Sequence, residues 1–453
     1  MSDGSSIDAV LSTVRERVTP SEAERSRMQA VAAALLEEIA AAAREYHPDA
    51  DAILVGSTAR GTWLPGERDV DVFVRFPTDV DRETLGEYGL AVGHDVLADG
   101  REEYAEHPYV TGTRDGFDVD VVPCYRVSDA TMIRTSVDRT PFHDAYLQEH
   151  LDDELATEVR VTKQFLTAIG AYGSDLRTRG YSGYLTELLV LEYGGFRELC
   201  QAAAEWVPPV RLDPGDRGMT AFEDALTVID PTDRERNVAA VCSAANVARL
   251  THHARAFLAS PSVEHFEERE HEPLSEADLS AHLEARGTTP MALRFDAPDL
   301  VEDELYPQLR KSRRGLVRAL QGHGFEVLRS AAWAEDHAVL FFEFSVAERP
   351  AIARHDGPPV HVRAHAENFL AAYRDEPSVY GPSLDGDRYV VERPREVRSA
   401  REFLASDAVF EAALGVHVES AMEEGYELLV GDEVAALAPE FGVQLARYFD
   451  PAP

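Results

Sequence analysis

The segment from Gly56 to Phe76, GSTARGTWLPGERDVDVFVRF, is the strongest indication of the fold in this 453-residue chain. In its second half acidic and apolar residues alternate, which is typical of a β-strand whose successive side chains point to opposite faces. Asp69 and Asp71 therefore share one face, and the valines that follow them point into the interior. Two carboxylates on one face of a strand predict a binding site for a cation.

The residues at the start of this segment predict a site for phosphate. A short apolar run from Ala52 to Val55 indicates a buried strand, and it leads into Gly56, Ser57 and then Arg60. A Gly-Ser turn lets backbone N–H groups and a hydroxyl approach phosphate oxygens, and a nearby arginine adds a bidentate donor. A phosphate site beside a cation site indicates nucleotide chemistry.

A second strand supplies a further carboxylate. The stretch from Gly112 to Tyr125, GTRDGFDVDVVPCY, has an Asp-Gly pair between two extended runs, a strong signal for a β-hairpin. Asp118 and Asp120 alternate with valines in its second arm and also share a face. Because Mg²⁺ prefers oxygen ligands and a two-metal site needs carboxylates from different strands, we expect one of these two acids to join the first pair.

Chance is the competing explanation for each acidic pair. A chain with 82 acidic residues places aspartates at alternate positions of solvated strands by composition alone. The combination of a strand, a Gly-Ser turn and two Asp-Val-Asp-Val motifs is much more specific. It favours the metal site.

Further motifs extend the pattern, namely HPYV from His107, SVDRTPFH ending at His143, YGSDLRTRGYSGYLTELL from Tyr172 and DPTDRERNVAA from Asp230. Together they resemble the archaeal, class I CCA-adding enzymes, tRNA nucleotidyltransferases of the DNA polymerase β superfamily. The resemblance implies an α+β fold with three parts. These are a polymerase β-like catalytic head over residues 1–148, an α-helical nucleotide- and tRNA-binding neck over 149–280, and a C-terminal tRNA-binding body and tail over 281–453, made of a small antiparallel sheet with helices.

The same resemblance implies roles for particular residues. Mg²⁺ would be held by Asp69, Asp71 and Asp120, while Asp118 would lie further out. Contacts to the nucleotide would come from Ser57, Arg60, His143, Lys163 and Tyr172, and Arg236 would help to select the base. Other interpretations stay open: His143 as a capping or core histidine, Tyr172 as a core aromatic, and Arg236 as a helix-start residue in an ion pair.

The resemblance implies that C, C and A are added to the 3′ end of tRNA from CTP and ATP, without a nucleic-acid template. The alternatives are another RNA nucleotidyltransferase of this superfamily, such as a poly(A) polymerase, a protein-adenylylating enzyme, or an inactive RNA-binding scaffold. The intact set of carboxylates argues against the scaffold. The RERN motif that ends at Asn237 and the long C-terminal half argue against a small protein-modifying transferase.

The formal net charge of −38 does not exclude a nucleic-acid partner. Of 44 basic residues only Lys163 and Lys311 are lysine, and the acids are dispersed along the whole chain. Proteins of extreme halophiles have such a composition, because concentrated salt screens the repulsion between acids. One dense basic cluster, predicted to lie on one helix, could bind tRNA phosphates or pair with the acids at 302–304: Arg310, Lys311, Arg313, Arg314 and Arg318.

The remaining sequence predicts location and secondary structure. There is no run of 18 apolar residues and no signal peptide, so we expect a cytoplasmic protein without membrane contact; a homodimer stays open. Helices are predicted from a capping box at Thr19 to Tyr46, over 149–170 and over 184–205, so that residues 150–260 are mostly helical. Residues 291–346 predict three strands with one covering helix. Proline-rich connectors follow, with helical pieces near 364–373 and 398–414.

Overall fold

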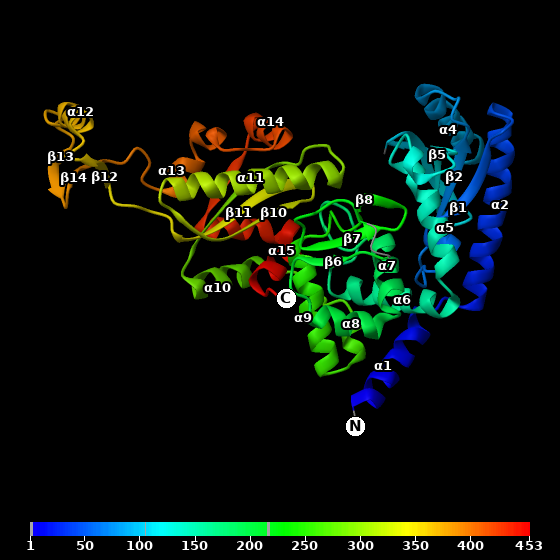
Figure 1. Cartoon of the computed structure of the whole chain (residues 1–453). Coiled ribbons are helices and arrows are strands. Elements are labelled where there is room, and N and C mark those ends of the chain that lie inside the picture. Colours follow the sequence, from blue (N-terminus) through cyan, green and yellow to red (C-terminus); the bar gives the residue numbers. More distant parts are fainter. Residues whose placement is uncertain (1–2, 105, 215–217) are drawn as a thin grey trace. The chain divides into compact units, whose positions relative to one another are not determined.

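The computed structural model describes residues 3–104, 106–214 and 218–453, with side chains from residue 6 onward. Its internal contacts divide the chain into two compact units (Figure 1). The first comprises residues 1–269 with residue 453, and the second comprises residues 270–452. In the described ranges, every helix is too short or too polar to cross a membrane.

The first unit contains a five-stranded sheet in the order β1-β2-β5-β4-β3. The central strands β2 and β5 run parallel, and the other neighbours are antiparallel. The Asp-Gly turn between β4 and β5 is confirmed, because Asp115 and Gly116 both have positive φ, 52° and 78°. The strands are β1 (Asp51–Val55), β2 (Asp69–Phe76), β3 (Arg101–Tyr104), β4 (Pro108–Arg114) and β5 (Phe117–Tyr125).

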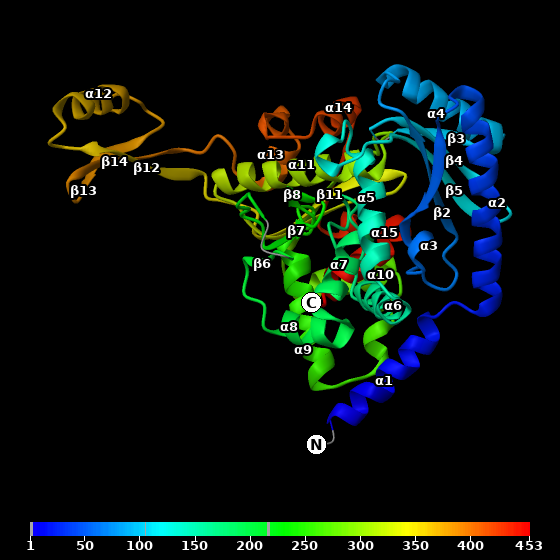
Figure 2. The ribbon, with the colours of Figure 1, turned by 45° about the vertical axis from the view of Figure 1, so that its right-hand side comes forward.

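One face of this sheet is covered by α2 (Glu22–Tyr46) and α4 (Arg82–Val96) (Figure 2). Their apolar side chains pack on the valines of β2 and β5, as the alternation predicts. The start of α2 differs from the prediction. Its N-cap is Ser21, whose hydroxyl accepts from the Glu24 N–H while the Glu24 carboxylate accepts from Ser21, because a separate helix, α1 (Asp3–Val18), ends just before.

The rest of the first unit is mainly helical but also holds a small sheet that the sequence did not predict. The stretch expected to be one helix over 184–205 is two helices, because Gly194 ends the first in a left-handed conformation with φ 84°. The helices are α3 (Gly56–Arg60), α5 (Thr140–His150), α6 (Asp153–Ala168), α7 (Gly183–Tyr193), α8 (Phe196–Ala204) and α9 (Ala244–Ala259), with short 3-10 turns at 130–132, 137–139 and 263–266. The sheet has the order β6-β7-β8, with β6 (Val210–Leu212), β7 (Leu226–Asp230) and β8 (Asp233–Asn237).

The second unit is built on a four-stranded antiparallel sheet in the order β10-β11-β9-β15. The predicted strands and helix are confirmed, but the single covering helix is wrong. One face packs on α11, α13 and α14, and the other packs on α10, the turn η5 and α15. The elements are α10 (Glu276–Arg286), β9 (Thr289–Asp296), α11 (Glu302–Gly322), β10 (Glu326–Ala334), β11 (His337–Val346), α13 (Ala400–Leu404), η4 (Asp407–Glu411), α14 (Val416–Glu424), β15 (Glu427–Val430), η5 (Gly431–Leu437) and α15 (Ala438–Phe449).

In the proline-rich stretch after β11, the helix predicted near 364–373 is confirmed, but the segments predicted to be connectors form a small sheet. Its strands are β12 (Ile352–Pro359), β13 (Tyr380–Asp385) and β14 (Arg388–Pro394), in the order β12-β14-β13, with α12 (Arg363–Tyr373) packed against them. The prolines stand where pairing is irregular or ends: register shifts lie between Asp356 and Pro359 and between Tyr380 and Ser383. Proline is tolerated in strands at such positions because it needs no ladder partner there.

Candidate active site

The register between β2 and β5 brings the four predicted acids together. Asp69 lies opposite Asp118, and Asp71 lies opposite Asp120. All four are on the sheet face that α2 and α4 leave open, because the valines between them fill the covered face. Asp69 and Asp118 are exposed and form the outer pair, whereas Asp71 and Asp120 are half-buried.

The short helix α3 holds the Gly-Ser segment against the acids. Gly56 has φ 77°, and a Cβ at this position would overlap the Oδ2 atom of Asp71. The Thr58 hydroxyl donates to the backbone carbonyl of Asp69 at 2.6 Å, which ties α3 to β2. Glycine is therefore required here for a close approach between the turn and a carboxylate.

A cavity of about 450 Å³ lies in front of these residues. It brings together seven of the nine residues predicted for the site, drawn from β2, β5, α3, α6 and the segment after α6. They are Asp69, Asp71, Asp120, Ser57, Arg60, Lys163 and Tyr172, and they are joined by Asp118, Gly56, Gly183 and two acids that the sequence did not predict, Glu67 and Glu187.

Repulsion and burial raise the pKa values of the inner acids. The pKa of Asp71 rises to about 6, first because the carboxyl is buried and then because Asp120 and Asp69 carry the same charge nearby. Burial also raises the pKa of Asp120. Crowded carboxylates of this kind are costly to ionise without a cation, and a bound divalent ion would relieve the repulsion.

The donor set fits Mg²⁺ in an open site. In the part of the chain that the structure describes, no three His, Cys, Asp or Glu side chains already form a cluster that could hold a metal. Mg²⁺ seldom uses an all-protein cage, because it keeps several waters and is bound by one or two carboxylates together with substrate phosphates. Hard oxygen donors on adjacent strands, beside a cavity lined by cations, match that mode.

Arg60 lines the cavity but is held by two buried carboxylates. It donates to both oxygens of Glu187, from Nε at 3.0 Å and from Nη2 at 2.9 Å, and its Nη1 pairs with Asp144. The Thr62 hydroxyl also donates to Glu187. These bonds take three of the five N–H donors of the guanidinium and fix its plane.

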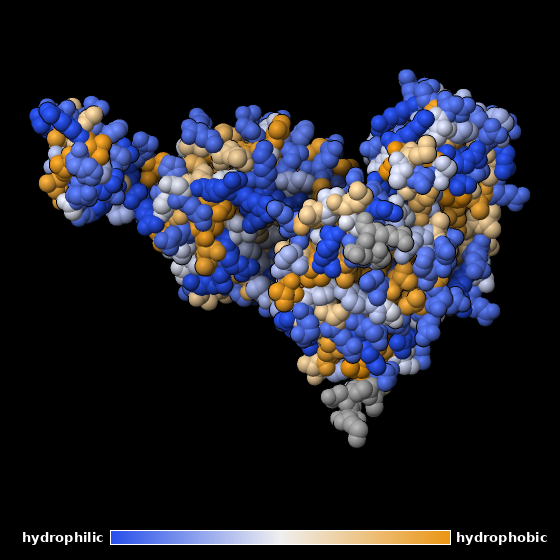
Figure 3. All heavy atoms as spheres, in the orientation of Figure 1, coloured by the Kyte–Doolittle hydropathy of each residue, from blue (hydrophilic) through white to orange (hydrophobic). Residues whose placement is uncertain are grey.

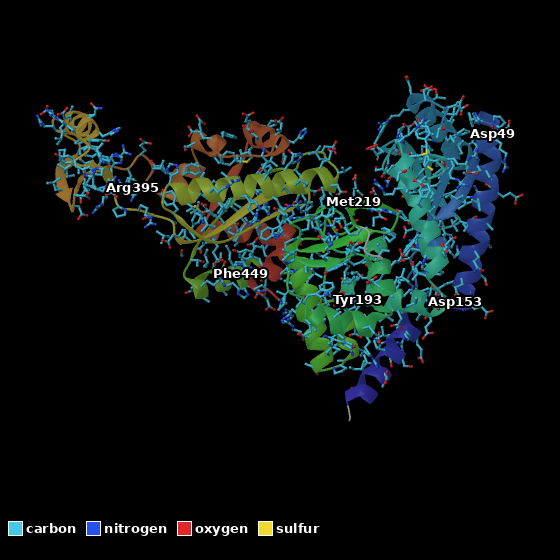
Figure 4. All side chains as sticks on the ribbon, in the orientation of Figure 1. Asp49, Asp153, Tyr193, Met219, Arg395 and Phe449 are labelled. Atoms are coloured by element: carbon cyan, nitrogen blue, oxygen red, sulfur yellow. The ribbon has the colours of Figure 1, made fainter. Side chains whose placement is uncertain are left out.

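Lys163 is one of the buried residues of α6. Figure 4 labels Asp153, the first residue of this helix. Lys163 is only 2% exposed, and burial lowers the pKa of its ammonium group. Its Nζ atom lies 5.8 Å from the centre of the Tyr172 ring, a separation at which a cation and an aromatic face attract each other. Lys163 and Tyr172 therefore form one wall of the cavity.

The two remaining predicted residues lie elsewhere in the first unit. His143 and Arg236 are absent from the lining of this cavity and instead meet at Asp230, at the end of β7. Arg236 is on the strand β8, so its expected position at a helix start is wrong. The ion pair considered for Arg236 does form, with Nη1 at 2.8 Å from an Asp230 oxygen.

The sequence analysis did not predict a role for three buried acids of this region, Asp144, Glu187 and Asp230, which are 5%, 0% and 1% exposed. Glu187 lies on the mainly apolar helix α7, whose other acid, Glu192, is exposed. An acid on the buried side of a mainly apolar helical stretch is a detectable signal, because a buried carboxylate needs partners. Asp230 lies inside the DPTDRERN motif but had no assigned role.

In the second unit, the predicted basic cluster lies on α11, whose visible face is largely hydrophilic (Figure 3). Lys311, Arg314 and Arg318 are exposed and spaced along one side of the helix. Arg313 instead donates to the backbone and hydroxyl of Ser330. A role of the exposed cations in tRNA binding stays a prediction.

Comparison with known proteins agrees with this arrangement. Family models match residues 36–143 (nucleotidyltransferase domain), 157–267 (second domain of tRNA nucleotidyltransferase) and 286–431 (C-terminal domain of CCA-adding enzymes). A solved RNA terminal U-transferase covers 57% of this chain and 98% of its own, but with a TM-score of 0.43 and 17% identity it adds nothing to the assignment.

Relatives that are CCA-adding enzymes align over nearly the whole chain. The enzyme of Haloarcula marismortui is 59% identical and that of Halobacterium salinarum 56% identical, each over 98% of this chain and at least 98% of the relative. The enzyme of Methanoregula boonei is 40% identical over 96% of this chain and 93% of its own. This chain belongs to the family of CCA-adding enzymes.

Proposed function

We propose that this protein completes the 3′ end of tRNA in the cytoplasm by adding C, C and A from CTP and ATP without a template. The observation that supports this most is the cavity that carboxylates of two parallel strands line together with Lys163 and Arg60. Carboxylates that suit metal ions, within the same cavity as cations that suit a triphosphate, are what nucleotidyl transfer needs.

Asp69, Asp71 and Asp120 are the residues that would hold Mg²⁺. The bound ions would neutralise charge on the triphosphate and favour ionisation of the attacking 3′-hydroxyl. Asp71 and Asp120 are the inner pair, and the repulsion between them makes that position the most favourable for a cation. Asp118, in the outer pair, would act only through the charge that it adds.

The other residues of the cavity would place the nucleotide. Lys163 would donate to triphosphate oxygens from its buried position, where exclusion of water strengthens the attraction. Ser57 would donate its hydroxyl, and Tyr172 would keep the ammonium group of Lys163 in place. Arg60, already oriented by Glu187, would offer its remaining N–H groups without a loss of side-chain freedom.

The tRNA would bind by its shape and backbone, with Lys311, Arg314 and Arg318 of α11 contacting phosphates. A homodimer remains a prediction without a structural argument.

The test uses tRNA that lacks its 3′ CCA, with Mg²⁺ and labelled CTP and ATP, in molar KCl. Growth by three nucleotides that stops is the expected result. An open-ended A tail would show a poly(A) polymerase instead, and the absence of any addition to RNA would overturn the proposal. Chelation of Mg²⁺ should stop the reaction, and its return should restore it.

A further inference from the structure

A single buried carboxylate, that of Asp230, joins the two predicted nucleotide residues that lie outside the cavity. His143 Nε2 and Arg236 Nη1 both lie 2.8 Å from its Oδ2 atom. Its Oδ1 atom accepts from the Tyr184 hydroxyl at 3.2 Å and from the backbone and hydroxyl of Thr232 at 2.9 and 2.8 Å. We call these five residues the Asp230 cluster.

The cluster fixes the directions of His143 and Arg236. The imidazole of His143 stacks on the ring of Tyr184, with 3.9 Å between the ring centres and 15° between the planes. One oxygen of Asp230 is shared by His143, from α5, and by Arg236, from β8. If either His143 or Arg236 moved, the Asp230 carboxylate would shift, and the position of the other residue would shift with it.

The two faces of the cluster differ in exposure. The Asp230 side chain is 0% exposed and that of His143 is 13% exposed, whereas the Arg236 side chain keeps 35% of its surface exposed. Arg236 is thus anchored through Nη1 at its buried end and open on its other side. An arginine held in this way can donate to a ligand with little loss of side-chain entropy.

The negative charge of Asp230 keeps Arg236 bound to it. Hydrogen bonds and ion pairs hold the pKa of Asp230 far below its usual range despite its burial, so it stays ionised. A buried anion that lost Arg236 would be left with fewer partners, so the ion pair resists separation.

We propose that Asp230 is a positioning residue for base selection, which holds the guanidinium of Arg236 at a fixed place relative to His143. The inference rests on the proposed function and adds to it a residue with no assigned role. Base and triphosphate would then be recognised in one common geometry, although the two contacting residues come from α5 and β8.

The experiment is a double-mutant cycle between Asp230→Asn and Arg236→Gln. The measured quantity is the ratio of kcat/KM for CTP to that for ATP on tRNA that lacks CCA. We expect Asp230→Asn to reduce this ratio at least about tenfold, equivalent to about 1.4 kcal/mol of discrimination. In the Arg236→Gln background it should reduce the ratio no further, because its effect acts through that arginine.

A matched control lies just before β7 of the same small sheet. Asp224 accepts from the Asn237 amide at 2.9 Å, and within the described residues it forms no hydrogen bond or ion pair with Arg236 or His143. Asp224→Asn should lower the melting temperature slightly and leave the CTP-to-ATP ratio unchanged. If Asp224→Asn shifted the ratio as much as Asp230→Asn, selection would depend on the stability of the sheet, and the proposal would fail.

Other results of these measurements would also test the role proposed for Asp230. Equal losses by Asp230→Asn in both backgrounds, or an unchanged ratio in a folded Asp230→Asn protein, would overturn the proposal. If Asp230→Asn does not fold, the Arg236→Gln variant is used alone. A CTP-to-ATP ratio of kcat/KM equal to that of the parent protein would then exclude base selection by Arg236 and overturn the proposal. Failure of the unaltered protein to add C and A to tRNA would instead reject the proposed function itself.

Discussion

The central sheets of the two units differ in how many of their faces are covered by helices. The five-stranded sheet of the first unit packs helices on one face and presents four acids on the other, whereas the four-stranded sheet of the second unit is covered on both faces. The contrast appears in two acids. Asp71 is half-buried among other carboxylates, but Glu343 of β11 is 0% exposed and has its own donors.

The donors of Glu343 come from α10, from the loop that follows it and from α15. Arg286 donates from Nε at 2.5 Å and from Nη2 at 3.0 Å, the Thr288 hydroxyl at 2.6 Å, and the Tyr448 hydroxyl at 3.0 Å. These bonds lower the pKa of Glu343, whereas burial and repulsion raise that of Asp71. A carboxylate whose partners are built into the protein contributes to stability, and one whose partner is missing is prepared for a ligand.

The largest expected effect is on catalysis by the open sheet. Asp71→Asn should lower nucleotide addition at least about a thousandfold, or about 4 kcal/mol of transition-state stabilisation, because it removes a charge that binds metal. The tRNA affinity, measured by filter binding, should stay nearly unchanged. Asp118→Asn, in the outer pair, is the comparison: an equal loss there would contradict the division into inner and outer acids.

Next in size is the stability of the covered sheet. Glu343→Gln should lower the free energy of unfolding by about 2 kcal/mol, because the buried carboxylate loses its charge-assisted hydrogen bonds from Arg286, Thr288 and Tyr448. Denaturant unfolding in molar KCl measures this. Glu335→Gln, at an exposed acid bonded to Gln444, should change it by less than about 0.5 kcal/mol. Similar losses in both variants would show that Glu343 is not special.

Lys163 and Lys311, the only lysines, extend the comparison to cations. Lys163→Arg should reduce addition at least about tenfold with an unchanged melting temperature, because a planar guanidinium is bulkier than the buried ammonium it replaces. Lys311→Arg should cost almost nothing, since an exposed charge on α11 can be supplied by either residue. Equal activity of the two variants would remove Lys163 from the triphosphate site.

The smallest effects concern the stability of the metal-free protein, to which Asp71 and Glu343 contribute with opposite dependences on pH. The folded pKa of Asp71, about 6, lies above its usual 3.8, so its contribution to stability is lost as pH rises between these values. The folded pKa of Glu343 lies below 4.5, so its contribution is present above that pH and is lost as pH falls through the folded pKa. Relative to the parent protein, Asp71→Asn should therefore gain stability as pH rises from 4 toward 6.

Between pH 4.5 and 6, Glu343→Gln should keep its full deficit in stability, and this deficit should shrink as pH falls below 4.5. Melting curves of both variants and the parent protein at several pH values, with a chelator present, test this. Two variants that follow the same pH trend would show that the two acids are not in opposite environments.

Local patterns in the sequence were sufficient for the parts of the fold that depend on neighbouring residues. The alternation in β2 and β5, the Asp-Gly hairpin and the order of β9, α11, β10 and β11 all follow from side-chain periodicity and turn chemistry. The same reasoning failed at Gly194, where a left-handed glycine ends a helix, and in the proline-rich region, where bulges let strands form. Those errors come from backbone geometry that a short apolar pattern does not specify.

The alternation along each strand was enough to predict that Asp69 shares a face with Asp71 and that Asp118 shares a face with Asp120, because alternate side chains of a strand lie on the same side wherever it folds. The pairing of β2 with β5, which places the two pairs next to each other, and the residues that surround them depend on the tertiary structure. Arg60 meets Glu187 across 127 residues of sequence and His143 meets Asp230 across 87, since the packing of α5, α7 and β7 brings them together. Contacts over such distances depend on how whole elements pack, and no local pattern along the chain encodes that.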